Sequence, residues 1–212
     1  ENSIFTDINL RMDAMTRLGV DLQVLSPNPL TMFHGIEADT AIHFCRKHND
    51  LMSRTVIDND KFLGLAALPI QDVEASCHEL QRAVRELGLS GACIGTDFPG
   101  GFDSAHLNQL FEKLVELDVP LFVHPASTDG RSGLRDSRLD SYNLSLSLGY
   151  AYEETLAVSQ IIFGGVLKRF PELDICISHG GGCFSFLAEK MTKLAKLTDP
   201  DFDYMGMVKN LW

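Results

Sequence analysis

The chain has 212 residues, 45% of them hydrophobic and 22% charged, with a formal net charge of −11 at pH 7. The hydrophobic share excludes a disordered chain, and the length allows one sizeable globular core or two small ones. The acidic balance, with a pI near 5.0, argues against a basic surface for nucleic acid. No apolar run approaches the roughly 20 residues of a membrane span, so we expect neither nucleic acid nor a membrane as a partner.

The first residues and the cysteines indicate the cellular compartment that we expect for the protein. The chain begins Glu1-Asn2-Ser3-Ile4, without the basic start and apolar core of a signal peptide. The cysteines are scattered and form no Cys-x-x-Cys pair. An odd, dispersed set is typical of reduced thiols, so we expect a cytoplasmic protein.

Helical and strand-like patterns alternate along the chain. Helical spacing of apolar residues predicts helices over residues 7–18, 37–58, 72–87, 104–117, 152–170 and 184–197. Short apolar runs between them predict strands over residues 20–26, 61–69, 91–95, 120–124 and 173–178, with a candidate sixth strand beginning in residues 207–212. The strands are apolar on both faces and no hairpin signal joins them, so the sequence predicts an all-parallel α/β fold.

Two all-parallel architectures compete, an open doubly wound sheet and a (β/α)₈ barrel. No Gly-x-Gly-x-x-Gly follows the first strand, where Pro27-Asn28-Pro29 stands instead, and this weakens a dinucleotide-binding interpretation. Polar residues at the ends of several strands favour the barrel. A full barrel takes about 250 residues and eight strands, however, which is more than this sequence provides.

Two histidines stand where predicted strands end. His124 closes one apolar run and is followed by Pro125, and His179 closes another just before Gly180-Gly181-Gly182. The carboxyl ends of parallel strands meet at one rim of a barrel, so the two imidazoles can share a pocket. There they could ligate a divalent metal or move protons near pH 7; the alternative is a histidine that merely bonds a backbone carbonyl. Two histidines do not complete a zinc site, which takes three protein ligands.

Other candidates carry weaker signals. His34, in the loop after the first strand, and Asp97 lie on the same predicted rim, although the position of Asp97 before Pro99-Gly100 favours a turn-forming role. Cys183 is expected to pack between helix and strand rather than to act as a nucleophile. The remaining histidines are expected on helix surfaces: His43, His48, His78 and His106.

The segment over residues 126–149 is the longest irregular one, and loops of this length often cover a site. Its arginines could attract an acidic substrate, but aspartates balance them, so we expect a solvated lid. The arginines are Arg131, Arg135 and Arg138, and the aspartates are Asp129, Asp136 and Asp140.

The run from Phe163 to Gly182, which ends in Ile-Ser-His-Gly-Gly-Gly, resembles the amidohydrolase-2 family. Within that family it is most similar to decarboxylases of the α-amino-β-carboxymuconate-ε-semialdehyde type and related aromatic acid decarboxylases. Supporting stretches lie at residues 12–27, 62–69 and 121–125, and the resemblance extends over nearly the whole chain.

The resemblance implies a (β/α)₈ TIM barrel with one divalent metal, usually zinc and in some members manganese. It implies that His124 ligates this metal and that His179 serves in acid/base work beside a metal-bound water. An arginine that holds a substrate carboxylate in the semialdehyde decarboxylase corresponds here to Lys190, which keeps the charge but loses the bidentate fork. Relatives often form dimers through the outer helices, so a homodimer is expected.

The sequence departs from the family in its ligands. The family's first strand carries a His-x-His pair and a late strand carries a ligating Asp, and neither appears here. We therefore expect a single amidohydrolase-like barrel domain over residues 1–212 that is incomplete at both ends, without the first strand and the late strands.

These observations favour a metal-dependent decarboxylase of a small unsaturated or aromatic carboxylic acid, working through a metal-bound water and an acid/base histidine. The first alternative is a hydrolase or hydratase that uses the same metal-bound hydroxide, because both reactions need the same ligands. The second is a metal-free scaffold, which the missing ligands favour only if the chain is complete.

Overall fold

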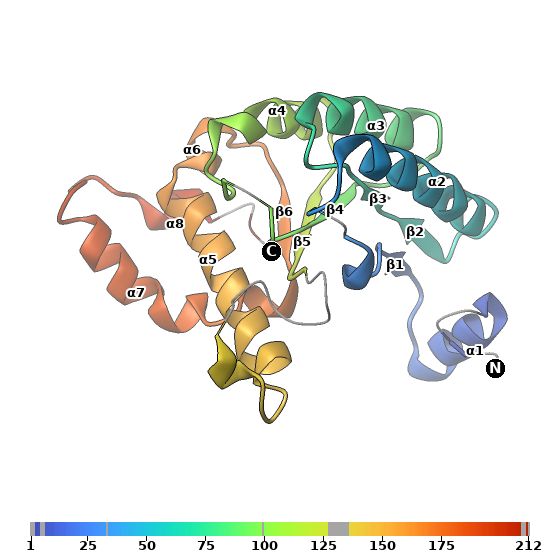
Figure 1. Ribbon diagram of the computed structural model, residues 1–212, viewed down its shortest axis with the longest axis horizontal. Helices are drawn as coiled ribbons and strands as arrows, with labels where there is room; N and C mark the ends of the chain where they lie inside the picture. Colours follow the sequence, from blue (N-terminus) through green and yellow to red (C-terminus); the bar gives the residue numbers. More distant parts are fainter. Residues whose placement is uncertain are drawn as a thin grey trace.

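The computed structural model describes residues 3–4, 7–32, 34–98, 100–126, 136–208 and 211. Helices and parallel strands alternate along it, which confirms the predicted α/β class (Figure 1). The strands are β1 (Gln23–Leu25), β2 (Phe62–Gly64), β3 (Ala66–Ala67), β4 (Ala92–Gly95), β5 (Leu121–His124) and β6 (Ile175–Ile177). The α-helices are α1 (Ile8–Leu18), α2 (Ala38–Val56), α3 (Val73–Arg85), α4 (Asn108–Leu117), α5 (Tyr150–Phe163), α6 (Val166–Arg169), α7 (Phe184–Ala195) and α8 (Tyr204–Met207). Short helical turns are η1 (Pro29–Thr31), η2 (Ala105–Leu107), η3 (Ser137–Leu139), η4 (Ser145–Gly149) and η5 (Ser178–Gly181).

The strands form part of a parallel barrel wall. β1 pairs with β2, and β3, β4, β5 and β6 pair in that order, all in parallel. The N–H of Leu65, between β2 and β3, donates to the carbonyl of Leu25 at 2.9 Å, so the predicted strand over residues 61–69 is one run that changes its partner at Leu65. An isolated parallel bridge joins Ile175 to Leu211, within the segment where a sixth strand was predicted. The described strands do not close into a full cylinder.

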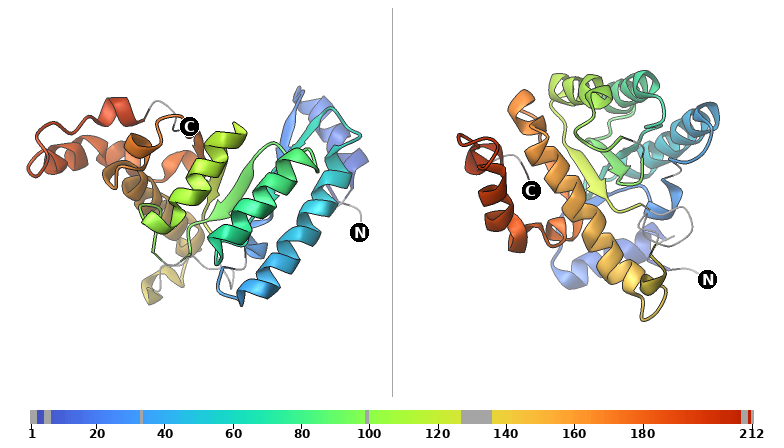
Figure 2. Two further views of the ribbon diagram at one scale, coloured as in Figure 1. Left: turned by 90° about the horizontal axis from the view of Figure 1, so that it is seen from above. Right: turned by 60° about the vertical axis from the view of Figure 1, so that its left-hand side comes forward.

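Helices cover the outer side of this wall. α2, α3 and α4 lie together along it, while α5 crosses beside β5 and β6, and α7 projects away from the strands (Figures 1 and 2). The main core includes fully buried side chains of β4 and of the covering helices: Ile94, Leu80, Leu110, Phe111 and Leu114. Among the described residues, none of the helices combines the length and apolarity needed to cross a lipid bilayer.

β5 shows how the wall separates core from site. Leu121 and Val123 are buried, whereas the alternating residues Phe122 and His124 are only partly buried on the opposite face. Successive side chains of a strand point to opposite faces, so the residues that fill the core also turn His124 toward the inner side. The pattern places the histidine at the carboxyl end of the strand, free of the helical layer.

The predicted helix over residues 152–170 is two helices. α5 ends at Phe163 and α6 begins at Val166, because Gly165 adopts a left-handed conformation with φ +70°. That conformation is open to glycine without the clash that a side chain would cause, and it breaks the hydrogen-bonded ladder of the helix.

A buried amide attaches α2 to the wall. Asn49 is fully buried; its Nδ2 donates to the carbonyl of Ala67 at 3.0 Å and to Glu79 Oε1 at 2.8 Å, and its Oδ1 accepts from the N–H of Ala67 at 2.8 Å. The side chain thus occupies both main-chain hydrogen-bonding groups of Ala67. A buried polar group is stabilising only when its partners are present, so this amide specifies how α2 sits on β3.

Asn49→Ala should lower the free energy of unfolding by about 2–4 kcal/mol, because it leaves the buried N–H and C=O of Ala67 and one Glu79 oxygen without this partner. Urea denaturation followed by circular dichroism measures the change. Asn9→Ala, at an exposed position of α1, is the control and should stay within about 0.5 kcal/mol of the parent. Equal midpoints for the two variants would contradict the assignment.

Candidate active site

His124 is held by its own backbone turn. Its Nδ1 lies 2.8 Å from the carbonyl oxygen of Pro125, which can only accept, so Nδ1 carries the proton and Nε2 keeps its lone pair. The ring is partly buried, and the ring of Tyr150 packs edge-on to it at 6.4 Å between centroids. Burial lowers the pKa of His124 below its ordinary value; the hydrogen bond to Pro125 opposes this, and the nearby His179 adds to it. His124 is therefore a neutral imidazole with an available Nε2 at neutral pH.

His179 faces His124 across the carboxyl rim of the strands. The ring centroids are 5.1 Å apart and the ring planes are inclined by 67°. Val123 pairs with Ile177, so the residues that follow β5 and β6 leave the wall at the same level. The predicted convergence of the two imidazoles on one rim is confirmed, while their chemical roles stay predictions.

The turn that carries His179 has an unusual backbone. His179 has φ +47° and ψ +29°, and Gly180, Gly181 and Gly182 also have positive φ values. The left-handed region is open to glycine but unfavourable for a residue with a bulky side chain. His179 is exposed on this turn, so its ring can reach a molecule in the space above the rim.

His34 and Asp97 form a second polar pair on the same rim. His34 Nδ1 lies 2.5 Å from Asp97 Oδ1, and both side chains are largely buried. Gly95, which pairs with His124 across β4 and β5, has no room for a Cβ, since one would lie 2.6 Å from the ring of His34 and 2.2 Å from Ala126. Asp97 was predicted to form a turn, and the signal for a role of His34 was weak; both were identifiable only by their shared position after strand ends.

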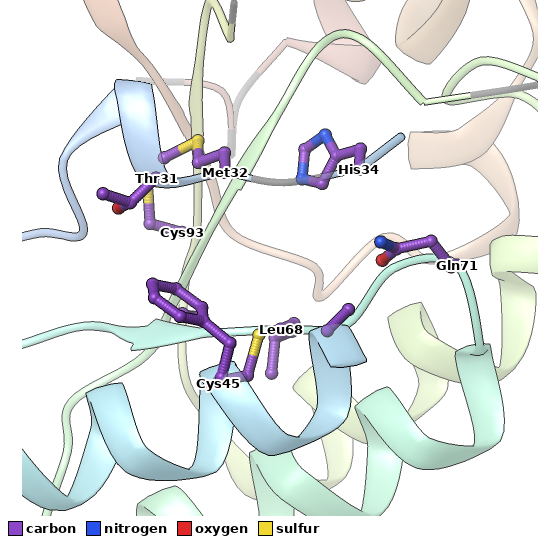
Figure 3. Close-up of a pocket in the computed structure, with 10 residues that line it drawn as sticks. Thr31, Met32, His34, Cys45, Leu68, Gln71 and Cys93 are labelled. Atoms are coloured by element: carbon purple, nitrogen blue, oxygen red, sulfur yellow. The ribbon is translucent and has the colours of Figure 1, made fainter. Parts of the chain in front are cut away.

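Two pockets adjoin His34. One is a cavity of about 20 Å³ that Met32, Cys45 and Cys93 help to line, with room for about one water (Figure 3). Burial raises the pKa of both Cys45 and Cys93 to about 12, so neither thiol is a nucleophile at neutral pH. The other, of about 250 Å³, is lined by residues of the loops that follow β1, β3 and β4: His34, Ile70, Gln71, Phe98, Ser104, His106 and Leu107.

Glu154 is a site residue that sequence analysis missed. It is fully buried on α5, and the hydroxyl of Ser178, next to His179, donates to its Oε1. Burial raises the pKa of Glu154 to about 7, and the hydrogen bond from Ser178 partly offsets this. A signal was present: Glu154 lies three and four residues before Ala157 and Val158, on the apolar face of the helix.

The other predicted residues make no described contact with the rings of His124 and His179, or they lie outside the described chain. Lys190 is exposed on α7, and none of its described contacts joins it to either histidine. Cys183 is exposed, so the expectation that it packs between helix and strand is wrong, because the glycine turn carries it outward. Arg131, Arg135 and Asp129 lie outside the described residues. Arg138 is paired with Asp136, with its Nη2 2.5 Å from Asp136 Oδ2. This is the balance of arginine by aspartate that we expected of a solvated lid.

The described residues include one histidine that is oriented like a metal ligand, but they do not supply a complete set of ligands. A histidine whose Nδ1–H bonds a carbonyl while Nε2 stays available has the orientation of a metal ligand, and His124 has this arrangement. Within the described ranges, no group of three or more His, Cys, Asp or Glu side chains could hold a metal. His124 therefore suits one position in a coordination shell.

A parallel wall with histidines at the carboxyl rim defines a barrel protein with its site at the strand ends. The amidohydrolase family profile matches residues 2–198, so the chain belongs to the amidohydrolase family. It is 36% identical over 182 residues to 2-amino-3-carboxymuconate-6-semialdehyde decarboxylase of Dictyostelium discoideum, a match that covers 85% of this chain and 49% of the relative. It is 30% identical over 205 residues to 2-keto-4-carboxy-3-hexenedioate hydratase of Sphingobium sp., covering 89% and 56%.

A solved structure is also similar. It is 5-carboxyvanillate decarboxylase of Novosphingobium aromaticivorans complexed with manganese and 4-hydroxy-3-methoxy-5-nitrobenzoic acid. The TM-score is 0.79 at 25% identity, over 97% of this chain and 58% of that one. This likeness confirms the predicted TIM-barrel class, of which the chain covers a part. The chain spans about half the length of the curated relatives it matches.

The raised pKa of Glu154 makes a prediction about stability and pH. Below about pH 4.3 the carboxyl is protonated in both the folded and the unfolded chain. Between that pH and pH 7 only the folded chain keeps the proton, so the free energy of unfolding falls as the pH rises. Glu154→Gln cannot ionise, so its free energy of unfolding should increase relative to that of the parent by on the order of 3 kcal/mol between pH 4 and pH 8. Urea unfolding at a series of pH values measures the difference. Parallel stability curves for the parent and this variant would contradict the burial assigned to Glu154, and Glu172→Gln, at an exposed position, serves as the control.

Proposed function

We propose that the natural protein containing this chain is a metal-dependent decarboxylase of a small unsaturated or aromatic carboxylic acid. The observation that carries the proposal is the 5.1 Å approach of the rings of His124 and His179 at the carboxyl rim. The 36% identity to a semialdehyde decarboxylase supports the reaction, and the similarity to a carboxyvanillate decarboxylase supports the substrate class.

His124 would hold a divalent metal through Nε2, together with ligands beyond those described here. The metal, when bound, would polarise oxygen atoms of the substrate and orient its carboxylate. Zinc is the metal that the family resemblance suggests, and the manganese complex of the carboxyvanillate decarboxylase supports manganese as the other choice. The Pro125 carbonyl fixes the ring of His124 for this task by binding its Nδ1–H.

His179 would manage the proton of the reaction. The bond between the substrate and its carboxylate breaks, carbon dioxide leaves, and the carbon takes a proton held on the imidazole of His179. The exposed ring and its position opposite His124 support this role, because a molecule held at His124 lies within its reach. Lys190, on the helix after the glycines, would bind a substrate carboxylate as a compact positive charge.

Three further properties belong to the proposal. Residues 1–212 would all belong to a single barrel domain, of which they form an incomplete part, the natural protein would be a homodimer, and it would reside in the cytoplasm. The scattered cysteines, all unpaired in the structure, support the compartment. Light scattering of the natural protein would measure its mass and decide between monomer and dimer.

A hydratase is the second candidate. The 30% identity to a hydratase of an unsaturated carboxylic acid favours it, because hydration also needs a proton delivered to carbon beside a bound carboxylate. Carbon dioxide release from a panel of unsaturated and aromatic acids separates the two reactions. A protein that binds no metal and converts none of these acids would be a scaffold instead.

His179→Asn in the natural protein should lower kcat by about 10²–10⁴-fold, because the amide cannot carry the proton. Metal content, measured by mass spectrometry, should stay at the parent level. His78→Asn, at an exposed position in α3, is the matched control and should keep full activity. Undiminished carbon dioxide release by His179→Asn would end the assigned role.

His124→Ala should lower the bound metal by at least about tenfold, together with the activity, because it removes a ligand. Added metal should restore little of either. A His124→Ala protein that retains the parent's metal content would show that this histidine is not a ligand.

A further inference from the structure

We propose that Glu154 is a positioning residue that acts through Ser178 to hold His179 in its working orientation. The inference rests on the proposed function, because it assigns a role around the same histidine. It concerns a contact between α5 and the glycine turn that neither the family resemblance nor the comparisons assign.

The turn needs support from outside itself. His179 has a left-handed backbone, and such a conformation in a residue with a side chain persists only where the surroundings fix it. The three glycines that follow have positive φ values as well and supply no stiffness of their own. The orientation of the His179 ring therefore depends on what holds the two ends of the turn.

α5 holds both ends with consecutive residues. On the near side, the hydroxyl of Ser178 donates to Glu154 Oε1. On the far side, the N–H of Cys183 donates to Thr155 Oγ1 at 2.8 Å. His179 and the glycines lie between these two attachment points.

The helix also approaches the turn closely. A Cβ on Gly182 would lie 2.0 Å from the carbonyl oxygen of Ala151 and 2.8 Å from Thr155 Oγ1, and one on Gly181 would lie 3.4 Å from Val158. These residues of α5, at positions three and four apart, form one face of the helix. The turn is thus seated on this face, with Glu154 at its centre.

A carboxyl group is a costly choice for packing alone. Glu154 is fully buried, and its second oxygen, Oε2, has no hydrogen-bond partner among the described residues. Burial of an unpaired polar atom is unfavourable, and an apolar side chain of the same size would avoid that cost. What the carboxyl adds over an apolar residue is the acceptor for Ser178, immediately before His179.

The variants separate the hydrogen bond from the charge and from the packing. Glu154→Gln keeps an acceptor for Ser178, Glu154→Leu keeps only the volume, and Ser178→Ala removes only the donor. Glu172→Gln makes the same charge change at an exposed position outside α5. Ser178→Ala deletes a single hydroxyl and keeps the test open if Glu154→Leu does not fold.

The first measurement is independent of activity. Nitrogen NMR of histidine-labelled natural protein, with His179→Asn to assign the signal, reports the environment of the His179 ring. We expect Glu154→Leu and Ser178→Ala to move this signal, and Glu154→Gln and Glu172→Gln to leave it near the parent value. An unmoved His179 signal in Ser178→Ala would overturn the proposal.

The second measurement is the kinetic split. Glu154→Leu and Ser178→Ala should lower kcat by about 10–100-fold and change KM by less than about threefold, because a proton donor is displaced while substrate binding persists. Glu154→Gln should restore kcat to within about threefold of the parent. A Glu154→Gln protein as slow as Glu154→Leu would overturn positioning in favour of the charge itself. If the parent converts no acid, the proposed function fails, and the NMR comparison still decides whether Glu154 positions His179.

Discussion

The parallel register of β5 and β6 is the constraint on which the site depends. Val123 pairs with Ile177, so the chain leaves both strands at the same height and on the same side of the wall. His124 is the last residue of its strand, and His179 follows its strand by two residues. A slip of one residue in this register would turn the inward residues of a strand into the helical layer. The core residues Leu121, Val123 and Ile175, fully packed against the helices, prevent that slip.

The two histidines are held by different means. His124 bonds the carbonyl of the next residue, so its orientation is fixed locally by the strand end and Pro125. His179 sits on a turn of positive φ values whose two ends are attached to α5. A ring fixed by its own backbone suits a task that needs one unchanging direction for a lone pair. A ring on a turn that is supported at both ends suits a task in which a proton moves, because the support from α5 keeps the exposed ring in one orientation.

Sequence patterns predicted the strand ends well and the contacts across the chain poorly. His124 and His179 were identifiable because Pro125 and the glycines mark where each apolar run stops. The pairing of His34 with Asp97 joins residues 63 positions apart, and Ser178 reaches Glu154 across 24. No periodicity encodes such partners, since they depend on how the elements pack. Lys190 came from a family correspondence, and the exposed position of Cys183 follows from backbone angles that apolar patterning does not reveal.

The charge near the rim differs from the charge of the whole chain. With a net charge of −11, the protein as a whole should repel an acidic molecule. Two carboxyl groups lie close to the residues of the rim, however, and each is hydrogen-bonded to a neighbour. Asp97 is bonded to His34, and the buried Glu154 has a pKa of about 7, so it is largely protonated in mildly acidic solution. The acidic surface can therefore keep the protein dispersed, while the rim itself presents imidazoles to an acid that arrives there and the carboxyl of Glu154 stays buried.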